Sequence, residues 1–140
     1  MFKAPVKKKF IKNFLVYLKI IKKKTFCSTL QYGTYGIKAI ESGYLSPQQL
    51  EATRRIFSRS IKKNFGQIWM RIVPNLSKTK KPNEMRMGKG KGPVKAWYYA
   101  VFPGCILFEI SGISYINATI LLRIASTKLP IKSKIVTLRK

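Results

Sequence analysis

Hydrophobic residues in the middle of the chain recur at helical spacing and predict a first helix over residues 47–63. Leu50, Phe57 and Ile61 would form the buried stripe of this helix. The start of the helix carries a capping box and a hydrophobic staple: Ser46 at the N-cap, Pro47 in the first turn, Gln49 at N3, and Leu45 and Leu50 as the staple pair.

Alternation of apolar and polar residues predicts a strand over residues 66–74. Ile68, Met70 and Ile72 would point to one side of it. Trp69, on the other side, is interpreted as a packing residue rather than a platform for base stacking. Further strands are expected at residues 34–45, in a hairpin formed by residues 96–104 and 105–112 around Pro103 and Gly104, and at about 134–138.

A second helix is expected over residues 115–129, because Ser114 can cap its start and Pro130 stops its end. Between residues 75 and 93 the periodicity disappears and Lys, Thr, Pro and Gly dominate, which predicts a long loop. Loops of this length in compact domains are usually functional or disordered.

Composition adds a strong constraint on the partners of the chain. The 140 residues are 46% apolar, enough for one domain with a core. Against 4 acids stand 29 Lys and Arg, giving a formal charge of +25 that favours a polyanionic partner. Nucleic acid is the leading candidate and an anionic membrane the second. No stretch approaches the roughly 20 uncharged residues of a membrane-spanning helix.

Catalytic and metal-binding groups are scarce. The chain has no histidine, and its four acids are scattered along the sequence. General acid–base chemistry and carboxylate-bound metals therefore have few candidates. Cys27 and Cys105 are far apart in sequence and show no metal-type spacing, so we interpret both as structural or incidental thiols. No catalytic residue, metal or cofactor is expected.

Residues 1–30 form a basic extension without acid or glycine. Ile11, Phe14, Leu15 and Leu18 have helical spacing and are surrounded by lysines. Three interpretations stay open: an organelle-targeting peptide, a membrane-surface helix, or an arm that orders on RNA. We favour the RNA arm, because targeting peptides prefer arginine and serine, and these are scarce here.

The segment NEMRMGKGKGPVKAW, residues 83–97, concentrates glycine and positive charge. Its alternating glycines would let the backbone lie against a sugar-phosphate chain, the lysines between them would add charge, and the preceding arginine would grip a phosphate. The alternative is a flexible hairpin tip with solubilising lysines. A nucleotide-binding P-loop does not fit. Its last glycine is followed by Lys and then Ser or Thr, whereas Pro93 follows Gly92, the last glycine here.

Several motifs resemble the bacterial-type family of large-subunit ribosomal protein sixteen. They are RMGKGKGPVKAW, YGTYGIKAI, LSPQQLEATRRIFSRSIKK, GQIWMRIVP, PGCILFEISGI and ASTKLPIK, and they occur in the order and spacing of that family. The resemblance covers about residues 31–140. Two features depart from it: a lysine-rich apolar segment replaces most of the usual basic arm, and Asn64 and Phe65 lengthen the turn before Gly66.

The resemblance implies a structural ribosomal protein rather than an enzyme. Its expected fold is α+β of the hammerhead type, a small mixed sheet or barrel with two packed helices, here over residues 31–140 with a loop at 75–93. It also implies a position near the base of the central protuberance, with the Arg-Met-Gly loop directed toward A-site and P-site tRNA. The expected partners are large-subunit rRNA, tRNA and neighbouring large-subunit proteins, with no membrane span and no homo-oligomer.

Two sets of site residues follow from the resemblance and the basic positions. The expected tRNA-binding residues are Arg86, Met87, Gly88, Lys89, Gly90, Lys91 and Gly92. The expected rRNA-binding residues are Lys7, Lys8, Lys9, Lys12, Lys22, Lys23, Lys24, Lys38, Arg54, Arg55, Arg59, Lys62, Lys63, Arg71, Lys132 and Lys134.

An excess of 22 Lys over 7 Arg, together with 17 Ile, indicates an AT-rich genome. With the divergent arm, this favours a ribosome in the mitochondrial matrix; an AT-rich bacterium and a plastid are the alternatives. The competing functions are a free RNA chaperone or a cationic surface-binding protein.

Overall fold

The computed structural model describes residues 11–13, 27–61 and 66–138, and these form two helices and seven strands. Residues 11–13 are not helical, and the rest of the helix expected near residues 11–18 lies outside the described ranges, as does the end of the first helix at residues 62–63. In chain order the elements are β1 (Tyr35–Ala39), β2 (Gly43–Leu45), α1 (Pro47–Ile61), β3 (Gln67–Met70), β4 (Leu76–Thr79), β5 (Val94–Val101), β6 (Ile106–Ser111), α2 (Tyr115–Ser126) and β7 (Ser133–Thr137).

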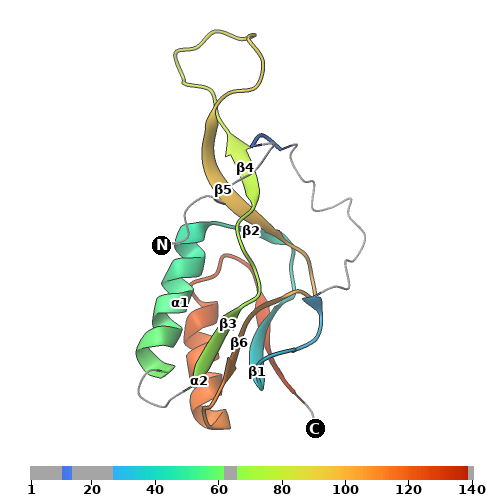
Figure 1. Ribbon diagram of the computed structural model, residues 1–140, viewed down its shortest axis with the longest axis vertical. Helices are drawn as coiled ribbons and strands as arrows, with labels where there is room; N and C mark the ends of the chain where they lie inside the picture. Colours follow the sequence, from blue (N-terminus) through green and yellow to red (C-terminus); the bar gives the residue numbers. More distant parts are fainter. Residues whose placement is uncertain (1–10, 14–26, 62–65, 139–140) are drawn as a thin grey trace.

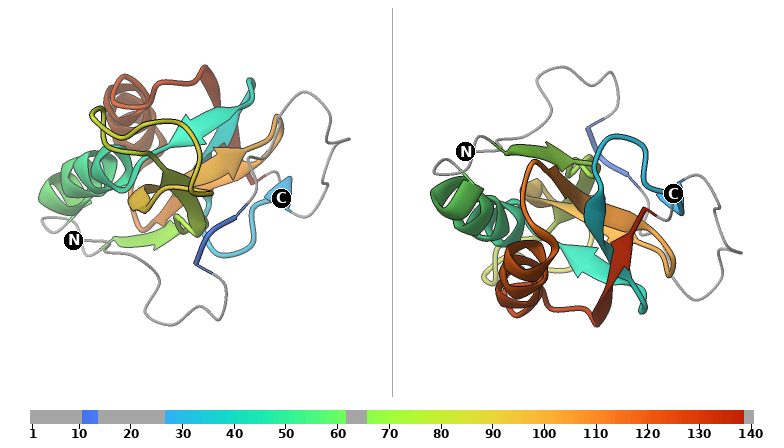
Figure 2. Two further views of the ribbon diagram at one scale, coloured as in Figure 1. Left: turned by 90° about the horizontal axis from the view of Figure 1, so that it is seen from above. Right: turned by 90° about the horizontal axis from the view of Figure 1, so that it is seen from below.

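The strands build two sheets, in the orders β3-β6-β1-β7 and β2-β5-β4. The helices α1 and α2 lie side by side against the four-stranded sheet, while the three-stranded sheet extends away from it (Figures 1 and 2). The expected α+β class with two packed helices is confirmed. Every strand pairing is antiparallel, so neither sheet is mixed, and no barrel closes among the described residues.

The hairpin predicted from residues 96–104 and 105–112 is wrong, although both of its strands exist. β5 pairs with β2 and β4, whereas β6 pairs with β1 and β3. Gly104, at a left-handed φ of 86°, donates its N–H to Ala39 O at 2.8 Å, and Ala39 N–H donates to Cys105 O at 2.8 Å. These bonds start the second strand alongside β1 and so carry the chain into the other sheet.

The predicted loop at residues 75–93 is shorter in the structure, because β4 occupies its first part and the loop itself spans residues 80–93. The four residues of β4, Leu-Ser-Lys-Thr, show no clear alternation in sequence. Pairing with β5 makes them a strand.

The start of α1 follows its sequence signal. Ser46 N–H donates to Gln49 Oε1 at 2.9 Å, and Gln49 N–H donates to Ser46 Oγ at 3.3 Å, which is the predicted capping box. α2 also starts where predicted, but the Ser114 side chain makes no cap hydrogen bond. It ends at Ser126, three residues early, because Leu129 N–H bonds back three residues, to Ser126 O, in a tighter turn.

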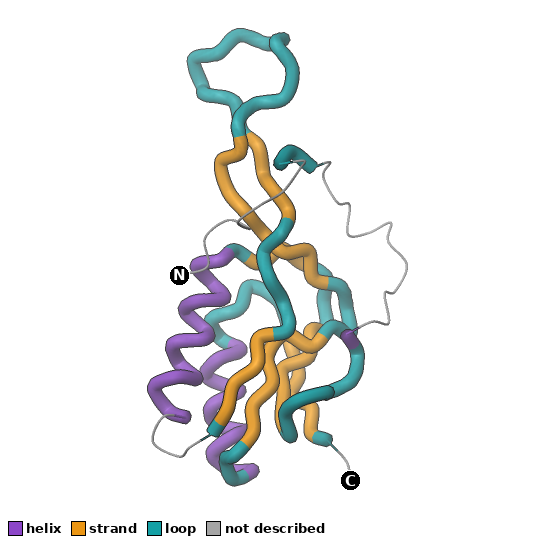
Figure 3. Tube along the Cα trace, viewed as in Figure 1, coloured by secondary structure: helices purple, strands orange, loops and turns teal. Residues whose placement is uncertain are grey.

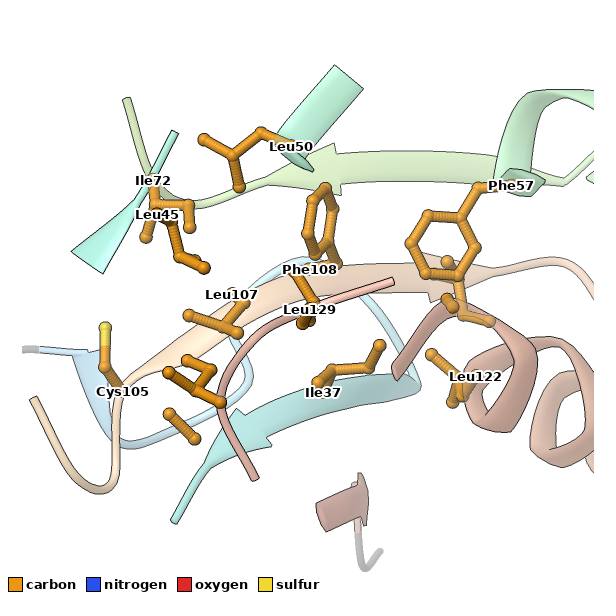
Figure 4. Packing of buried hydrophobic residues seen from close by; sticks show 14 of the residues in the cluster. Ile37, Leu45, Leu50, Phe57, Ile72, Cys105, Leu107, Phe108, Leu122 and Leu129 are labelled. Carbon is orange, nitrogen blue, oxygen red and sulfur yellow. The ribbon is translucent and has the colours of Figure 1, made fainter. Parts of the chain in front are cut away.

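The core lies between the helices and the four-stranded sheet (Figure 4). Phe57 of α1 meets Phe108 of β6 with ring centroids 5.3 Å apart. Leu50 and Ile61 complete the predicted stripe of α1 and are buried. The strand predicted at residues 66–74 is shorter in the structure, because β3 ends at Met70. Its alternation is confirmed: Ile68 and Met70 pack against the core and Ile72 is buried, whereas Trp69 stacks on Tyr32 at 6.2 Å, as the packing interpretation predicts.

Glu109 is a fully buried carboxylate in the middle of β6. Successive side chains of a strand point to opposite faces, so Glu109 points away from the helices that Phe108 contacts. Its Oε2 accepts the backbone N–H groups of Gln31, Tyr32 and Gly33 at 3.1, 2.7 and 2.8 Å. Its Oε1 forms an ion pair with Arg71, which follows β3.

These partners decide the charge state of Glu109. Burial alone would raise the pKa of Glu109, but the N–H groups of Gly33 and Tyr32 and the Arg71 guanidinium outweigh burial and lower it. Gly33 can approach because it has no side chain: a Cβ there would stand 2.8 Å from the Ile110 backbone nitrogen. Glu109 therefore binds the segment before β1 to two strands of the sheet.

We expect Glu109→Gln to destabilise the protein by about 3 kcal/mol or more at neutral pH, because Arg71 would stay buried without its counter-ion. Glu84→Gln, at an exposed loop position, is the matched control and should change stability by less than about 0.5 kcal/mol. Chemical denaturation measures both.

The pH dependence has a defined sign. Because the pKa of Glu109 is lower in the folded protein than in the unfolded chain, ionised Glu109 stabilises the fold fully at pH values above the unfolded-state pKa, about 4.3. This stabilisation is lost as the pH falls through the folded-state pKa. The stability difference between the wild type and Glu109→Gln should therefore be full at neutral pH and shrink in acid. Equal stability of the Glu109 and Glu84 variants at pH 7 would contradict this role.

Candidate nucleic-acid interface

The strands β4 and β5 form a hairpin that projects from the body along the longest axis of the molecule (Figure 1). Leu76 pairs with Tyr98 and Lys78 with Ala96, and the Lys80 N–H donates to Pro93 O at 3.2 Å to close the hairpin. The loop of residues 80–93 lies beyond this closure, remote from both helices (Figure 3). The hairpin thus holds the loop away from the helices and the four-stranded sheet.

The glycines of the loop serve two different purposes. Gly88, Lys89 and Gly90 have left-handed φ angles of 105°, 54° and 72° in succession. Such angles cost glycine little and other residues about 1 kcal/mol or more, so Lys89 carries local strain. Gly92 has an ordinary φ but no room, because a Cβ there would stand 2.9 Å from the Lys80 backbone carbonyl.

The loop presents its cations to solvent. Arg86 and Lys89 are exposed, and Met87 between them is 99% exposed. The Lys81 ammonium donates to the Gly88 carbonyl and so links the two arms of the loop. Residues 80–93 hold five cations and one acid, Glu84. The loop therefore combines an accessible backbone with positively charged side chains, which suits the binding of phosphate groups.

Residues 11–13 lie along the base of this loop, a contact that the sequence did not predict. Lys12 Nζ donates to Lys91 O at 2.9 Å, and Asn13 N–H donates to Ser77 Oγ at 3.2 Å. The Lys91 ammonium in turn donates to the Asn13 carbonyl. Lys91, expected to bind tRNA, and Lys12, expected to bind rRNA, therefore also tie the chain's early residues to the hairpin.

The charge of the expected rRNA-binding residues on α1 is partly neutralised by Glu51. Arg54 holds this carboxylate with two nitrogens, at 2.8 and 3.0 Å, and Arg55 approaches it at 3.4 Å. The Arg54 hydrogen bonds, ahead of charge attraction and Arg55, lower the pKa of Glu51 to about 2. Arg59 is exposed one turn further on, and Lys62 and Lys63 lie outside the described residues.

The other expected rRNA-binding residues have varied surroundings. Lys38 is half-buried and donates to Ser28 O at 2.9 Å. Lys132 forms an exposed ion pair with Glu41 at 2.9 Å, and Lys134 is exposed. Arg71 is directed inward to Glu109, with a side chain only 10% exposed. Lys7, Lys8, Lys9, Lys22, Lys23 and Lys24 lie outside the described residues.

Three of the four acids thus pair with residues that the sequence assigned to rRNA. The sequence signal for a structural cation is Glu109 itself, an acid inside the apolar run CILFEI, although it does not say which cation. A charge in such a run requires a buried partner.

The described residues hold no cluster of three metal-ligating side chains. Cys27 and Cys105 are free thiols. Burial and then the neighbouring Cys27 thiol raise the pKa of Cys105 to about 12, so this sulfur stays protonated and is a poor nucleophile. Within the described ranges, no helix is long and apolar enough to cross a membrane.

One face of α2 is apolar, and the sequence analysis missed it. Ile116, Ile120 and Ile124 follow one another at four-residue spacing and are all exposed, as is Tyr115. An open groove of about 210 Å³ beside this stripe reaches Ser60 of α1. Exposed apolar faces of this kind are typical of surfaces that bind another molecule.

Known proteins similar to this chain are ribosomal. The family model described as ribosomal protein L16p/L10e matches residues 5–136. The large ribosomal subunit protein uL16 of Buchnera aphidicola subsp. Cinara cedri is 49% identical over 104 residues, which cover 74% of this chain and 76% of the relative. The protein of the same name from Thermosipho melanesiensis is 47% identical over 109 residues, 78% and 76% of the two chains.

Proposed function

This chain belongs to the ribosomal protein L16p/L10e family, and we propose that within the large ribosomal subunit its loop at residues 80–93 contacts tRNA. The family comprises structural constituents of the large subunit rather than enzymes, and this chain is such a constituent. Its partners are accordingly rRNA and ribosomal proteins. Binding to rRNA within the subunit explains the high positive charge of the chain. The alternative functions, a free RNA chaperone or a cationic surface-binding protein, are not needed to explain it.

The observation that carries the tRNA proposal is the exposed, left-handed backbone at residues 88–90 between exposed cations. Left-handed glycines turn backbone N–H groups outward, and Lys89 adds a point charge. Arg86 adds a planar fork for one phosphate, while Met87 and Gly92 shape the tip and base of the loop. Contacts to phosphates ignore sequence, as a surface that accepts A-site and P-site tRNAs of every kind requires.

Removing two of these charges tests the tRNA contact. Ribosomes with Arg86→Ala and Lys89→Ala should assemble normally but bind tRNA roughly tenfold more weakly, a loss of about 1.4 kcal/mol. Lys91 is left in place, because it also holds the loop base. Filter binding of tRNA to purified ribosomes measures the effect.

The matched control is Arg123→Ala with Lys128→Ala, which removes the same two residue types from exposed positions in the last turn of α2 and just after it. It should leave tRNA binding unchanged. If ribosomes with the loop variant and with this control bind tRNA equally well, the loop does not contact tRNA and is only a flexible hairpin tip.

A second proposed contact is the binding of rRNA by the exposed cations of the body and by the basic extension, residues 1–30. Arg55 and Arg59 on α1 are its best-defined members, because Arg55 shares Glu51 with Arg54 and Arg59 is exposed. Arg71 is left out, since its charge is used internally by Glu109. The other proposed members are Lys7, Lys8, Lys9, Lys12, Lys22, Lys23, Lys24, Lys38, Arg54, Lys62, Lys63, Lys132 and Lys134.

We expect Arg55→Gln with Arg59→Gln to weaken binding to large-subunit rRNA fragments. Two lost phosphate contacts should lower the slope of log affinity against log salt by about 1.4 to 1.8. Arg123→Gln with Lys128→Gln changes the net charge equally and should keep the wild-type slope. If the α1 variant keeps the wild-type salt slope, Arg55 and Arg59 do not contact rRNA and face solvent.

The apolar face of α2 is proposed to contact a neighbouring large-subunit protein. Isoleucine side chains offer nothing to a phosphate, and Arg123 is the one charged residue within α2. An apolar protein surface would bury Ile116, Ile120 and Ile124 and gain about 25 cal/mol for each Å² covered. A homo-oligomer is not expected, because the chain works as one component of a larger assembly.

Photocrosslinking tests this assignment. With p-benzoyl-phenylalanine in place of Ile120, assembled subunits should yield an adduct to another ribosomal protein after irradiation. The same probe in place of Arg59 should yield an adduct to rRNA. Adducts of Ile120 that contain only rRNA would overturn the protein contact.

We further propose that the subunit is mitochondrial and that residues 1–30 stay on the mature protein. The lysine- and isoleucine-rich composition supports an organellar genome. The relatives named above are bacterial, so an AT-rich bacterium and a plastid remain the alternatives. The contacts of Lys12 and Asn13 with the hairpin support an extension that belongs to the folded protein.

Mass spectrometry of the protein from ribosomes of purified mitochondria tests both statements. The expected result is an intact mass that includes residues 1–30. A mature N-terminus near residues 25–30 would identify the extension as a targeting peptide, and absence of the protein from mitochondrial ribosomes would overturn the location.

A further inference from the structure

We propose that the groove between β2, the start of α1 and the β4–β5 hairpin binds one unpaired nucleobase of RNA. The inference rests on the proposed RNA-binding function and names a site for it. The groove has a volume of about 460 Å³, within the roughly 300–1,000 Å³ of typical ligand pockets. Its lining is mostly apolar and includes Tyr44, Tyr98, Lys78, Ser46 and Gln49.

A tyrosine pair supplies the stacking surface. The rings of Tyr44 and Tyr98 are perpendicular, at 88°, with centroids 5.1 Å apart. Tyr98 is buried, so it fixes the tilt of Tyr44, which is 43% exposed. A ring held in place in this way loses little freedom when a base stacks on it. Bases of every kind present a π-face to such a ring.

The capping box supplies hydrogen-bond donors at the same groove. Ser46 Oγ and Gln49 Oε1 accept the backbone bonds that start α1. The Ser46 hydroxyl hydrogen and the two Gln49 amide hydrogens are therefore the donors of these side chains. With the Lys78 ammonium, they match the carbonyl oxygens and ring nitrogens on the edges of nucleobases.

Charge around the groove favours RNA over an apolar peptide. Lys78 lines it, and Lys80 and Lys95 are exposed on the same hairpin, so the hairpin carries positive charge for the phosphates of a bound strand. The exposed tyrosine of α2, Tyr115, has different surroundings, because its helix carries isoleucines and no lysine. Tyr44 and Tyr115 thus form a natural pair for comparison.

The test measures the affinity of the full chain for single-stranded RNA oligonucleotides by fluorescence anisotropy. Tyr44→Leu keeps an apolar side chain but removes the ring, and it should weaken binding roughly 5-fold to 150-fold, the range of one base–aromatic stack. The salt slope should stay at its wild-type value, since no charge is lost. Tyr115→Leu is the matched control and should bind as the wild type does.

A second pair of variants tests the donors. Gln49→Glu keeps the acceptor of the capping box but replaces the amide hydrogens by a carboxylate that repels base carbonyls. It should weaken RNA binding more than Gln48→Glu, which makes the same charge change at the exposed neighbouring position. Thermal unfolding should show that neither variant destabilises α1.

The outcomes separate this inference from the function beneath it. If wild-type protein binds RNA with a steep salt slope while Tyr44→Leu and Tyr115→Leu bind equally well, the groove inference fails and the RNA function stands. If wild-type protein does not bind RNA, both fail. Ultraviolet crosslinks from RNA to Tyr44 or Tyr98, identified by mass spectrometry, would support the groove directly.

Discussion

The buried ion pair of Glu109 and Arg71 is the interaction on which the rest of the structure depends. It joins the end of β3 to the middle of β6, and the same carboxylate takes three backbone N–H groups from residues 31–33. A buried carboxylate without these partners would destabilise the fold by several kcal/mol. Residues 31–33, the end of β3 and the middle of β6 are therefore expected to assemble together. This fixes the four-stranded sheet and the position from which β1 begins.

That sheet in turn decides how the loop is presented. At Gly104 the chain leaves the hairpin sheet and enters the four-stranded sheet, where the Gly104 N–H and the Cys105 carbonyl are both hydrogen-bonded to Ala39. β5 is thereby left to pair with β4 and β2, and its far end extends beyond the body. The loop at residues 80–93 owes its exposure to this division, and the groove beside Tyr44 lies where β2 and α1 meet the same hairpin.

The few acids of the chain decide which of its cations are neutralised within the fold. With 4 acids against 29 cations, each acid has a choice of partners, and Glu41, Glu51 and Glu109 each hold cations within the fold. The cations they leave uncompensated include those of the loop and the end of α1. The apolar face of α2 stands apart from both, so one small domain carries positively charged surfaces and a separate apolar one.

The sequence by itself determined the features that depend on local chemistry. The capping box, the buried stripe of α1, the alternation around Ile72 and the glycine-rich loop each follow from residues close together in the chain, and the family followed from their order. Tertiary structure alone decided that β5 and β6 part into separate sheets, that β4 is a strand, and that Arg71 turns inward. These outcomes depend on partners distant in sequence, such as Ala39 for the turn at Gly104 and Glu109 for Arg71, and local periodicity carries no information about which distant residue will supply the missing hydrogen bond or charge.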